Sequence, residues 1–164
     1  MFKFYDYDKC LVHYAEEIKS LKQNKLHGAV NIAKPVLVLA VIQLIEEGLL
    51  QNNIILLAKG LEDRYSKLYE QYDRTGKTTR IDYPFYFMHN DGFWNIKWIG
   101  EPKEHENSPW RKFMREHVEY AYLDEDLWYL LQSADCRHRL MEFIIKEKLS
   151  GDQQTAQTPD IPGI

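Results

Sequence analysis

The first half of the chain contains three segments with helical hydrophobic spacing, separated by short polar connections. Apolar residues recur every three or four positions in residues 8–24, which predicts an amphipathic first helix. A continuous apolar run from Val36 to Ile42 follows Pro35, and Gly48 suits a helix stop, so we expect a largely buried helix over about 35–47, with the proline in its first turn. Residues 54–72 predict a further amphipathic helix. The second and third of these helices give the order helix, turn, helix.

The pattern then changes to a dense aromatic run that contains a turn signal. Glycine tolerates positive φ and aspartate can bond nearby amides, so Asp91-Gly92 predicts a tight turn between two antiparallel strands over about 82–99. With these two residues as the loop, three pairs of side chains would share one face of the hairpin: His89 with Trp94, Phe87 with Ile96, and Phe85 with Trp98. Two helices followed by a hairpin are typical of a winged helix.

The second half is predicted to be mostly helical. Residues 100–109 hold two prolines and several charges, as is typical of a surface loop. Helical spacing then predicts a helix over 110–119, a second from Asp124 to about 131, and a third from Asp135 to about 149.

These elements suit one compact domain, because 164 residues are enough to enclose a core. We expect a mainly helical α+β fold over residues 1–149, with a winged-helix-like helical core, an aromatic β-hairpin and C-terminal helices. Gln, Thr, Pro and Gly dominate residues 150–164, so this tail is expected to lack structure of its own.

Composition narrows the range of functions. The net charge of −4 argues against a general polyanion binder. The charges are segregated, however, because residues 59–80 carry more cations than acids whereas residues 101–126 are acidic, so a local basic face is compatible with this total. Cys10 and Cys136 lack the spacing of zinc ligands, and neither a signal peptide nor a membrane-spanning run is found. We expect a cytoplasmic protein without a metal or other cofactor.

No catalytic pattern emerges from the sequence. A glycine-rich phosphate loop, a Gly-x-Ser-x-Gly elbow and a His-Glu-x-x-His pair are all missing. His89-Asn90-Asp91 superficially resembles a His-Asn-His nuclease centre. Such a centre, however, needs a general-base histidine beside metal-binding residues, and the other histidines lack complementary spacing. We therefore expect no enzymatic activity.

Three blocks of sequence resemble one known family. They are Lys34-Pro35 before the apolar run, Tyr83-Pro84-Phe85 followed by Asn90-Asp91-Gly92-Phe93-Trp94, and the leucine-rich segment from Tyr120 to Leu140. Together they are similar to the N-terminal DNA-recognition domain of His-Asn-His restriction endonucleases, which in several members is a sulfur-binding domain that reads phosphorothioate DNA. The resemblance covers roughly residues 24–149. It implies a recognition module without the nuclease centre, which that family carries in a separate C-terminal domain.

The resemblance also implies a site for one DNA phosphate group. In a phosphorothioate, sulfur replaces a non-bridging oxygen and is larger, more polarisable and more weakly hydrated. The resembled domains form its pocket with a proline, the neighbouring tyrosine and a basic residue, which correspond here to Pro84, Tyr83 and Lys34. Ala33 stands where those domains have a histidine, and Phe87 where the residue can be small. These two departures favour unmodified or differently modified DNA over direct sulfur recognition.

The matched residues lead to three hypotheses about function. The preferred one is a non-catalytic module that binds double-stranded DNA and recruits a separately encoded nuclease. It assigns phosphate contacts to Lys34, Arg80, Lys97 and Arg111, a discriminating surface to Tyr83, Pro84 and Phe87, and a base-edge contact to Asn90. The alternative is a protein-interaction scaffold that has lost DNA binding and uses the acidic residues 101–126. The third hypothesis is a nuclease subunit whose active site forms only with a partner.

Overall fold

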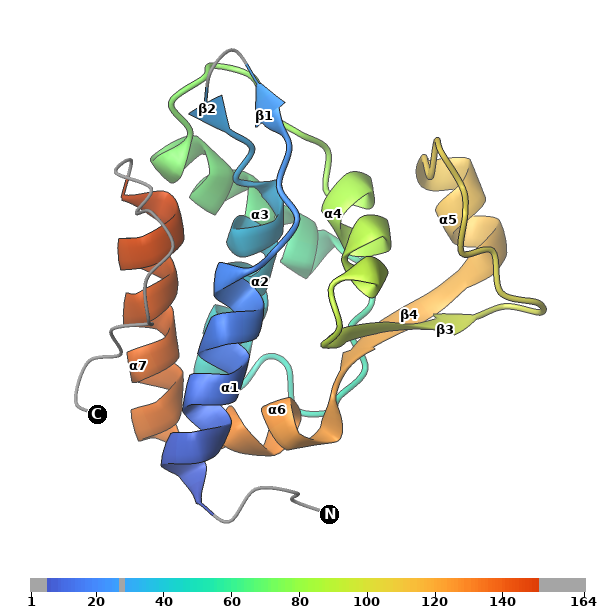
Figure 1. Cartoon of the computed structure of the whole chain (residues 1–164). Coiled ribbons are helices and arrows are strands. Elements are labelled where there is room, and N and C mark those ends of the chain that lie inside the picture. Colours follow the sequence, from blue (N-terminus) through green and yellow to red (C-terminus); the bar gives the residue numbers. More distant parts are fainter. Residues whose placement is uncertain (1–5, 27–28, 151–164) are drawn as a thin grey trace.

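The computed structural model describes residues 6–26 and 29–150 (Figure 1). In chain order its elements are α1 (Tyr7–Lys19), β1 (Lys25–Leu26), β2 (Ala29–Val30), α2 (Ala33–Glu46), α3 (Lys59–Tyr72), α4 (Asp82–Phe87), the 3₁₀ helix η1 (Met88–Asn90), β3 (Trp94–Trp98), α5 (Arg111–His117), β4 (Val118–Leu123), α6 (Glu125–Leu130), α7 (Ala134–Ile144) and the π-helical segment η2 (Ile145–Leu149). The mainly helical α+β class is confirmed. The predicted tail lies outside the described residues except for Ser150.

Helix α2 forms the centre of the core. It packs against α3 and α7, while α1 packs against α7 and α6 (Figure 1). Every residue from Ala33 to Ile42 is buried. A helix surrounded in this way needs no polar face, which explains the uninterrupted apolar run in its sequence.

Side-chain caps define the starts of the two outer helices. Asp6 Oδ1 accepts a hydrogen bond from the Lys9 N–H at 2.8 Å and so caps α1. Ser133 Oγ accepts one from the Cys136 N–H at 3.3 Å and caps α7. The cap of α7 is thus two residues before the predicted one, Asp135. Both residues are good caps by type, and only the backbone geometry distinguishes them.

The ends of α2 and α3 agree with the prediction at one point and differ at another. Gly48 has φ 74° and follows the end of α2, as expected for a left-handed stop. Residues 54–58, by contrast, are not helical. The N–H of Ile55 donates to the Ala121 oxygen at 2.7 Å, and the reciprocal bond is 2.8 Å. Tertiary pairing with β4 therefore holds this apolar segment extended, and α3 begins only at Lys59.

The aromatic run does not form the predicted hairpin. Residues 82–90 are helical, and only 94–98 form a strand. Strand β3 pairs antiparallel with β4, so that Trp94 lies opposite Leu123 and Ile96 opposite Ala121. The hairpin over 82–99 and the winged-helix order built on it are wrong, and so are the predicted facing pairs His89–Trp94, Phe87–Ile96 and Phe85–Trp98.

Local chemistry explains why this run is helical. Pro84 lies in the first turn of α4, where its missing N–H needs no partner. Trp94 Nε1 donates to the Phe85 carbonyl at 2.8 Å, and the two rings meet edge to face with centroids 5.4 Å apart. The start of β3 is thus packed against α4. Gly92, with φ 96°, lies in the turn as expected, but the periodicity of a short apolar run cannot distinguish a strand from a short helix.

The partner strand was not predicted. The expected helix over 110–119 ends at His117, and the chain continues as β4. In β4, Ala121 and Leu123 are buried while Tyr122 between them is exposed, which is the alternation of a half-buried strand. The sheet therefore joins segments about twenty residues apart, separated by a long loop and α5 (Figure 1).

Candidate nucleic-acid interface

Lys34 forms a largely buried ion pair. It lies in the first turn of α2, and its Nζ is 2.7 Å from Asp91 Oδ2 in the turn before β3. The side chains are only 10% and 2% exposed, respectively. Asp91 Oδ1 also accepts a hydrogen bond from the Lys22 N–H at 2.9 Å. Lys34 is therefore oriented by a buried carboxylate before any ligand arrives. Ala33 beside it supplies only a backbone N–H, which donates to Asn31 Oδ1 at 2.8 Å.

Two aromatic rings lie together on α4, which packs against α2. The Tyr83 and Phe87 ring centroids are 4.5 Å apart, and both side chains are half-buried. Asn24 Nδ2 donates to the Tyr83 hydroxyl at 2.9 Å, which fixes the direction of that ring. Pro84 is buried next to them. Phe87 thus takes up space directly against the tyrosine that the sequence identified.

A cluster of hydrogen bonds centred on Thr79 fixes the segment that precedes α4. Its carbonyl accepts from the Tyr65 hydroxyl at 2.7 Å, and its Oγ1 accepts from Asn31 Nδ2 at 3.0 Å and from the Tyr69 hydroxyl at 3.2 Å. Burial raises the pKa of Tyr65, with a further contribution from Tyr69. Its hydroxyl therefore remains a proton donor. The cluster ties α3 and the turn before α2 to the segment that carries Arg80, and sequence reasoning missed it.

Asp82 binds both arginines that the sequence singled out. Its carboxylate is fully buried, and Oδ1 accepts from Arg111 Nη2 at 2.8 Å and Nε at 3.1 Å. Oδ2 accepts from Arg80 Nη2 at 3.0 Å. Arg111 also pairs with Glu62. Burial alone would lower the pKa of Arg111, but the hydrogen bonds to Glu62 and Asp82 raise it above its ordinary value. Arg111 is thus held by two carboxylates.

Arg80 differs from Arg111 because most of it faces solvent. Its side chain is 61% exposed, and its guanidinium carbon lies 5.3 Å from the centre of the Trp110 ring. The structure therefore groups Lys34, Tyr83, Pro84 and Phe87 on α2 and α4, and links Arg80 with Arg111 through Asp82. Asn90 and Lys97 are exposed. Lys97 lies on β3 opposite Tyr120, and none of its described contacts joins it to Lys34 or Tyr83.

His89 holds a loop in place. Its Nδ1 is 2.6 Å from the Tyr86 carbonyl and its Nε2 is 3.1 Å from the Glu104 carbonyl. The Tyr86 hydroxyl donates to the Lys103 oxygen at 2.5 Å and accepts from the Glu106 N–H at 2.9 Å. Burial raises the pKa of Tyr86, which favours the neutral donor in these contacts. These bonds pin the loop after β3 against α4.

Cys10 is poorly suited to act as a nucleophile. Both cysteines are buried, and burial raises the pKa of Cys10 to about 12, with smaller contributions from Asp126 and Cys136. A thiol of this kind is a poor nucleophile. Within residues 6–26 and 29–150, no group of His, Cys, Asp and Glu side chains could hold a metal ion. Over the same residues, no helix is both long and apolar enough to cross a bilayer.

The fold is found among DNA sulfur-binding domains. The structure is similar to the sulfur-binding domain of SprMcrA complexed with phosphorothioated DNA, with a TM-score of 0.67, 20% sequence identity and 88% of each chain covered. At this identity the likeness shows the fold. The chain itself matches the model of the ScoMcrA-like DNA sulfur-binding domain over residues 13–157, and it belongs to that family. No curated protein gives a significant match.

Proposed function

We propose that this chain is a non-catalytic, cytoplasmic module that binds double-stranded DNA at a phosphorothioate linkage. Membership of the family over residues 13–157 supports DNA as the ligand, and the similar SprMcrA domain is described in complex with phosphorothioated DNA. One observation carries the proposal for this chain. Helix α2, which bears Lys34, packs against α4, which bears Tyr83 and Pro84, so a cation and an apolar surface come from neighbouring elements.

The chemistry of this site suits sulfur better than oxygen. Moving an anion into a partly buried site costs its hydration, and a weakly hydrated sulfur loses less than a phosphate oxygen does. The half-buried ring of Tyr83 offers a polarisable contact, while Lys34 supplies a positive charge from a position that is itself mostly dehydrated. Lys34 attracts both phosphate and phosphorothioate, so the preference for phosphorothioate comes from the weaker hydration of its sulfur.

The predicted phosphate contacts differ in how available they are. Arg80 and Lys97 are exposed, whereas Arg111 is bound by both Asp82 and Glu62. A second phosphate contact therefore falls to Arg80 first and Lys97 next. In this proposal Arg111 acts on DNA indirectly, by holding Asp82 and hence Arg80. The module would direct a separately encoded nuclease to the DNA that it binds.

Fluorescence anisotropy with matched duplexes tests the proposal. The protein is titrated with unmodified and phosphorothioate DNA at two salt concentrations, without divalent metal. We expect tighter binding to the phosphorothioate duplex and a steep loss of affinity with salt, because bound cations release condensed counterions. Tyr83→Ala should remove the preference. Tyr129→Ala, which removes a 46% exposed tyrosine from α6, is the matched control. Equal affinity for both duplexes would contradict sulfur reading.

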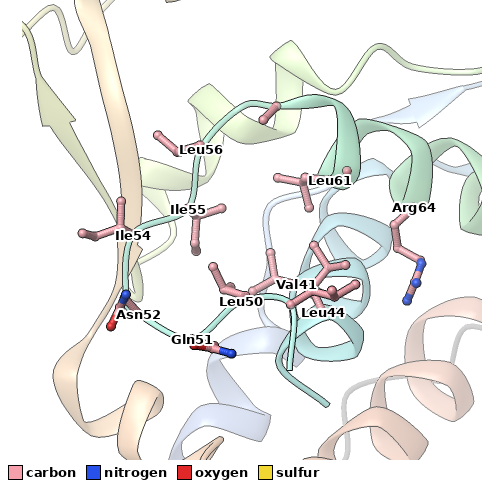
Figure 2. A pocket seen from close by; sticks show the side chains of 13 residues that line it. Val41, Leu44, Leu50, Gln51, Asn52, Ile54, Ile55, Leu56, Leu61 and Arg64 are labelled. Atoms are coloured by element: carbon pink, nitrogen blue, oxygen red, sulfur yellow. The ribbon is translucent and has the colours of Figure 1, made fainter. Parts of the chain in front are cut away.

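A protein-interaction scaffold is a second candidate, favoured by an apolar pocket to which α4 contributes no residue. Figure 2 shows this pocket, of about 660 Å³, between α2, the start of α3 and the extended segment before it. Leu49 and Leu56 on its wall are 70% and 55% exposed, so the pocket presents apolar side chains to solvent. If the wild-type protein binds neither duplex at low salt, this candidate replaces DNA binding.

A further inference from the structure

The segment before α3 lies against β4 as a short third strand of the β3–β4 sheet. The Asn53 side-chain amide and the Leu123 backbone exchange two hydrogen bonds, each of 2.8 Å. Ile55 and Ala121 exchange two more through their backbones, at 2.7 and 2.8 Å. Four bonds therefore hold this segment extended on one side, and its other side is an edge of the sheet.

This outer edge has unused backbone groups. Because backbone groups alternate in direction along an extended chain, those of Ile54 and Leu56 point away from β4. The Ile54 N–H donates to the Asn52 carbonyl at 2.7 Å. The Leu56 carbonyl accepts from the Ala58 N–H at 2.9 Å. Among the described residues, the Ile54 carbonyl and the Leu56 N–H have no hydrogen-bond partner. An acceptor and a donor two residues apart on one edge form a pattern to which a further strand can bind.

An apolar groove lies beside this edge. It is the pocket of about 660 Å³ between the extended segment, α2 and the start of α3 (Figure 2). Its wall includes Ile54 and Leu56, which are 45% and 55% exposed, and Leu49, which is 70% exposed. Ile55 is buried and points to the opposite side of the segment from these two neighbours (Figure 2). A backbone edge and an apolar groove thus come together, as at sites that bind an extended peptide by strand addition.

The charge at one end of the groove favours a basic ligand. A second pocket, of about 550 Å³, begins at Asn53 and is lined by the three carboxylates of residues 124–126. Among its described lining residues there is no lysine, arginine or histidine. Asp124 accepts hydrogen bonds from the Tyr14 hydroxyl at 3.2 Å and from the Asn95 amide at 3.1 Å, and both donors are uncharged. This end of the groove is therefore negative and complements a lysine or an arginine.

We propose that the groove binds an extended segment of a partner protein, with apolar side chains at every second position and a lysine or arginine at the end that reaches residues 124–126. The segment accepts from the Leu56 N–H and donates to the Ile54 carbonyl, while its apolar side chains fill the pocket. Neither Lys34 nor Tyr83 lines these two pockets, so the inference holds whether or not the chain reads phosphorothioate DNA.

NMR titration of the ¹⁵N-labelled protein with synthetic peptides tests this inference. The probe is a peptide of alternating valine and threonine with a pair of lysines at each end, and its matched form carries glutamates in place of the lysines. The lysine peptide should shift the amide signals of residues 49–56, with the largest change at Leu56. It should bind about 5-fold more tightly than the glutamate peptide, because the carboxylates attract one and repel the other.

Two substitutions at one position separate the backbone contact from the side chain. Leu56→Ala removes the apolar side chain and keeps the N–H, whereas Leu56→Pro also removes the N–H, which bonds to none of the described residues. The proline variant should bind the lysine peptide roughly 3- to 10-fold more weakly than the alanine variant, the usual effect of one backbone hydrogen bond. Ile99→Ala changes an exposed isoleucine outside both pockets and should leave the affinity unchanged. Circular dichroism verifies folding.

A lysine peptide that is N-methylated at its valines tests the same contact without changing the protein. It cannot donate to the Ile54 carbonyl and should not bind. Its binding at full affinity, shifts confined to other residues, or no binding of the lysine peptide to the wild-type protein would overturn strand addition. Equal affinity for the lysine and glutamate peptides would overturn the basic partner. Tighter binding of a helix-forming peptide would identify a helix groove instead, and dimerisation through this edge would assign it to a second copy. Each of these outcomes leaves DNA binding, measured separately, intact.

Discussion

The Lys34 and Arg80 sites follow the same plan but differ in what they leave open to solvent. In each, a carboxylate that is almost fully buried holds the cation: Asp91, 2% exposed, holds Lys34, and Asp82, 0% exposed, holds Arg80. The Lys34 side chain is itself only 10% exposed, whereas that of Arg80 is 61% exposed. Lys34 is therefore largely enclosed by the protein, whereas Arg80 is bound to a buried carboxylate but faces solvent.

Because of this difference, removal of Lys34 and removal of Arg80 should have different consequences. Removing a cation from a buried pair leaves a dehydrated carboxylate without compensation, so it affects stability as well as ligand binding. Removing an exposed cation costs little stability, because solvent already screens it. Substitution of Lys34 should thus change both stability and DNA binding, whereas substitution of Arg80 should change DNA binding alone.

The largest loss of stability is expected on substitution of Asp82, the carboxylate that holds Arg80. Asp82→Ala leaves Arg80 and Arg111 without their shared acceptor and should lower the free energy of unfolding by about 3 kcal/mol. Urea denaturation measures this change. Asp63→Ala is the matched control, because Asp63 pairs with Lys59 on the exposed surface of α3 and should have no measurable effect. Unchanged stability of the Asp82 variant would mean that burial does not make this carboxylate structural.

Lys34→Met should lower stability by about 2 kcal/mol and also weaken DNA binding, because Asp91 stays buried and loses its ion-pair partner. Arg80→Ala should weaken DNA binding and leave unfolding nearly unchanged. The double variant Lys34→Met with Asp91→Asn should regain part of the stability but not the binding, since the unpaired charge is removed together with the cation. Equal stability losses in the Lys34→Met and Arg80→Ala proteins would contradict the proposed difference between the buried and the exposed cation.

Phe87→Ala should change sulfur preference more than stability. The Phe87 ring lies 4.5 Å from that of Tyr83, and its removal opens space where a large sulfur atom could fit. We expect a higher ratio of phosphorothioate to unmodified affinity, with a stability loss of about 1–2 kcal/mol, less than for a fully buried phenylalanine. Parallel titrations of both duplexes measure the ratio. A lower ratio would mean that Phe87 is itself a sulfur contact.

Lys148 provides a third kind of cation site and the smallest expected effect. Its Nζ donates to two neutral oxygens, that of Lys19 at 2.5 Å and Gln23 Oε1 at 2.9 Å. Burial lowers its pKa from 10.5 to about 8, and nearby Lys19 contributes. Because the unfolded chain then binds the proton more tightly than the folded one, this residue makes stability rise with pH between about 8 and 10.

Urea denaturation of the wild-type and Lys148→Met proteins at pH 8 and pH 9.5 isolates this contribution, because the thiols and tyrosines that titrate in the unfolded chain over this range are common to both proteins. The Lys148→Met protein should gain less stability with pH, or lose more, than the wild-type protein. A slope that is the same in both proteins would assign the pH dependence to other groups.

Helices α2 and α4 show how far local patterns predict this fold. The apolar run of α2 is bounded by Pro35 near its start and Gly48 after its end, so its type and limits could be predicted. The run in α4 is short and aromatic, and its secondary structure depends on what it packs against. Strand β4 shows the same dependence, because its alternation is visible only over a few residues. Long periodic segments carry enough signal on their own, and short apolar ones do not.

The candidate site likewise has residues that the sequence could identify and residues that it could not. Lys34, Tyr83 and Pro84 could be named from a sequence motif, and the structure places them on adjacent helices. Their partners could not be named. Asp91 lies 57 residues from Lys34, and Asp82 lies 29 residues from Arg111. No local spacing relates such pairs, and a lysine that is bound by a buried carboxylate has the same letter in the sequence as one that is free.

The sequence by itself determined the helical class, the buried central helix, the family and the residues of its motif, since these depend on periodicity and local order. Only the tertiary structure decided that the aromatic run is helical, that β3 pairs with β4, and that Lys34 is buried while Arg80 is exposed. Burial and pairing arise from contacts between distant segments. The free energy of a charged group depends on those contacts far more than on its neighbours along the chain.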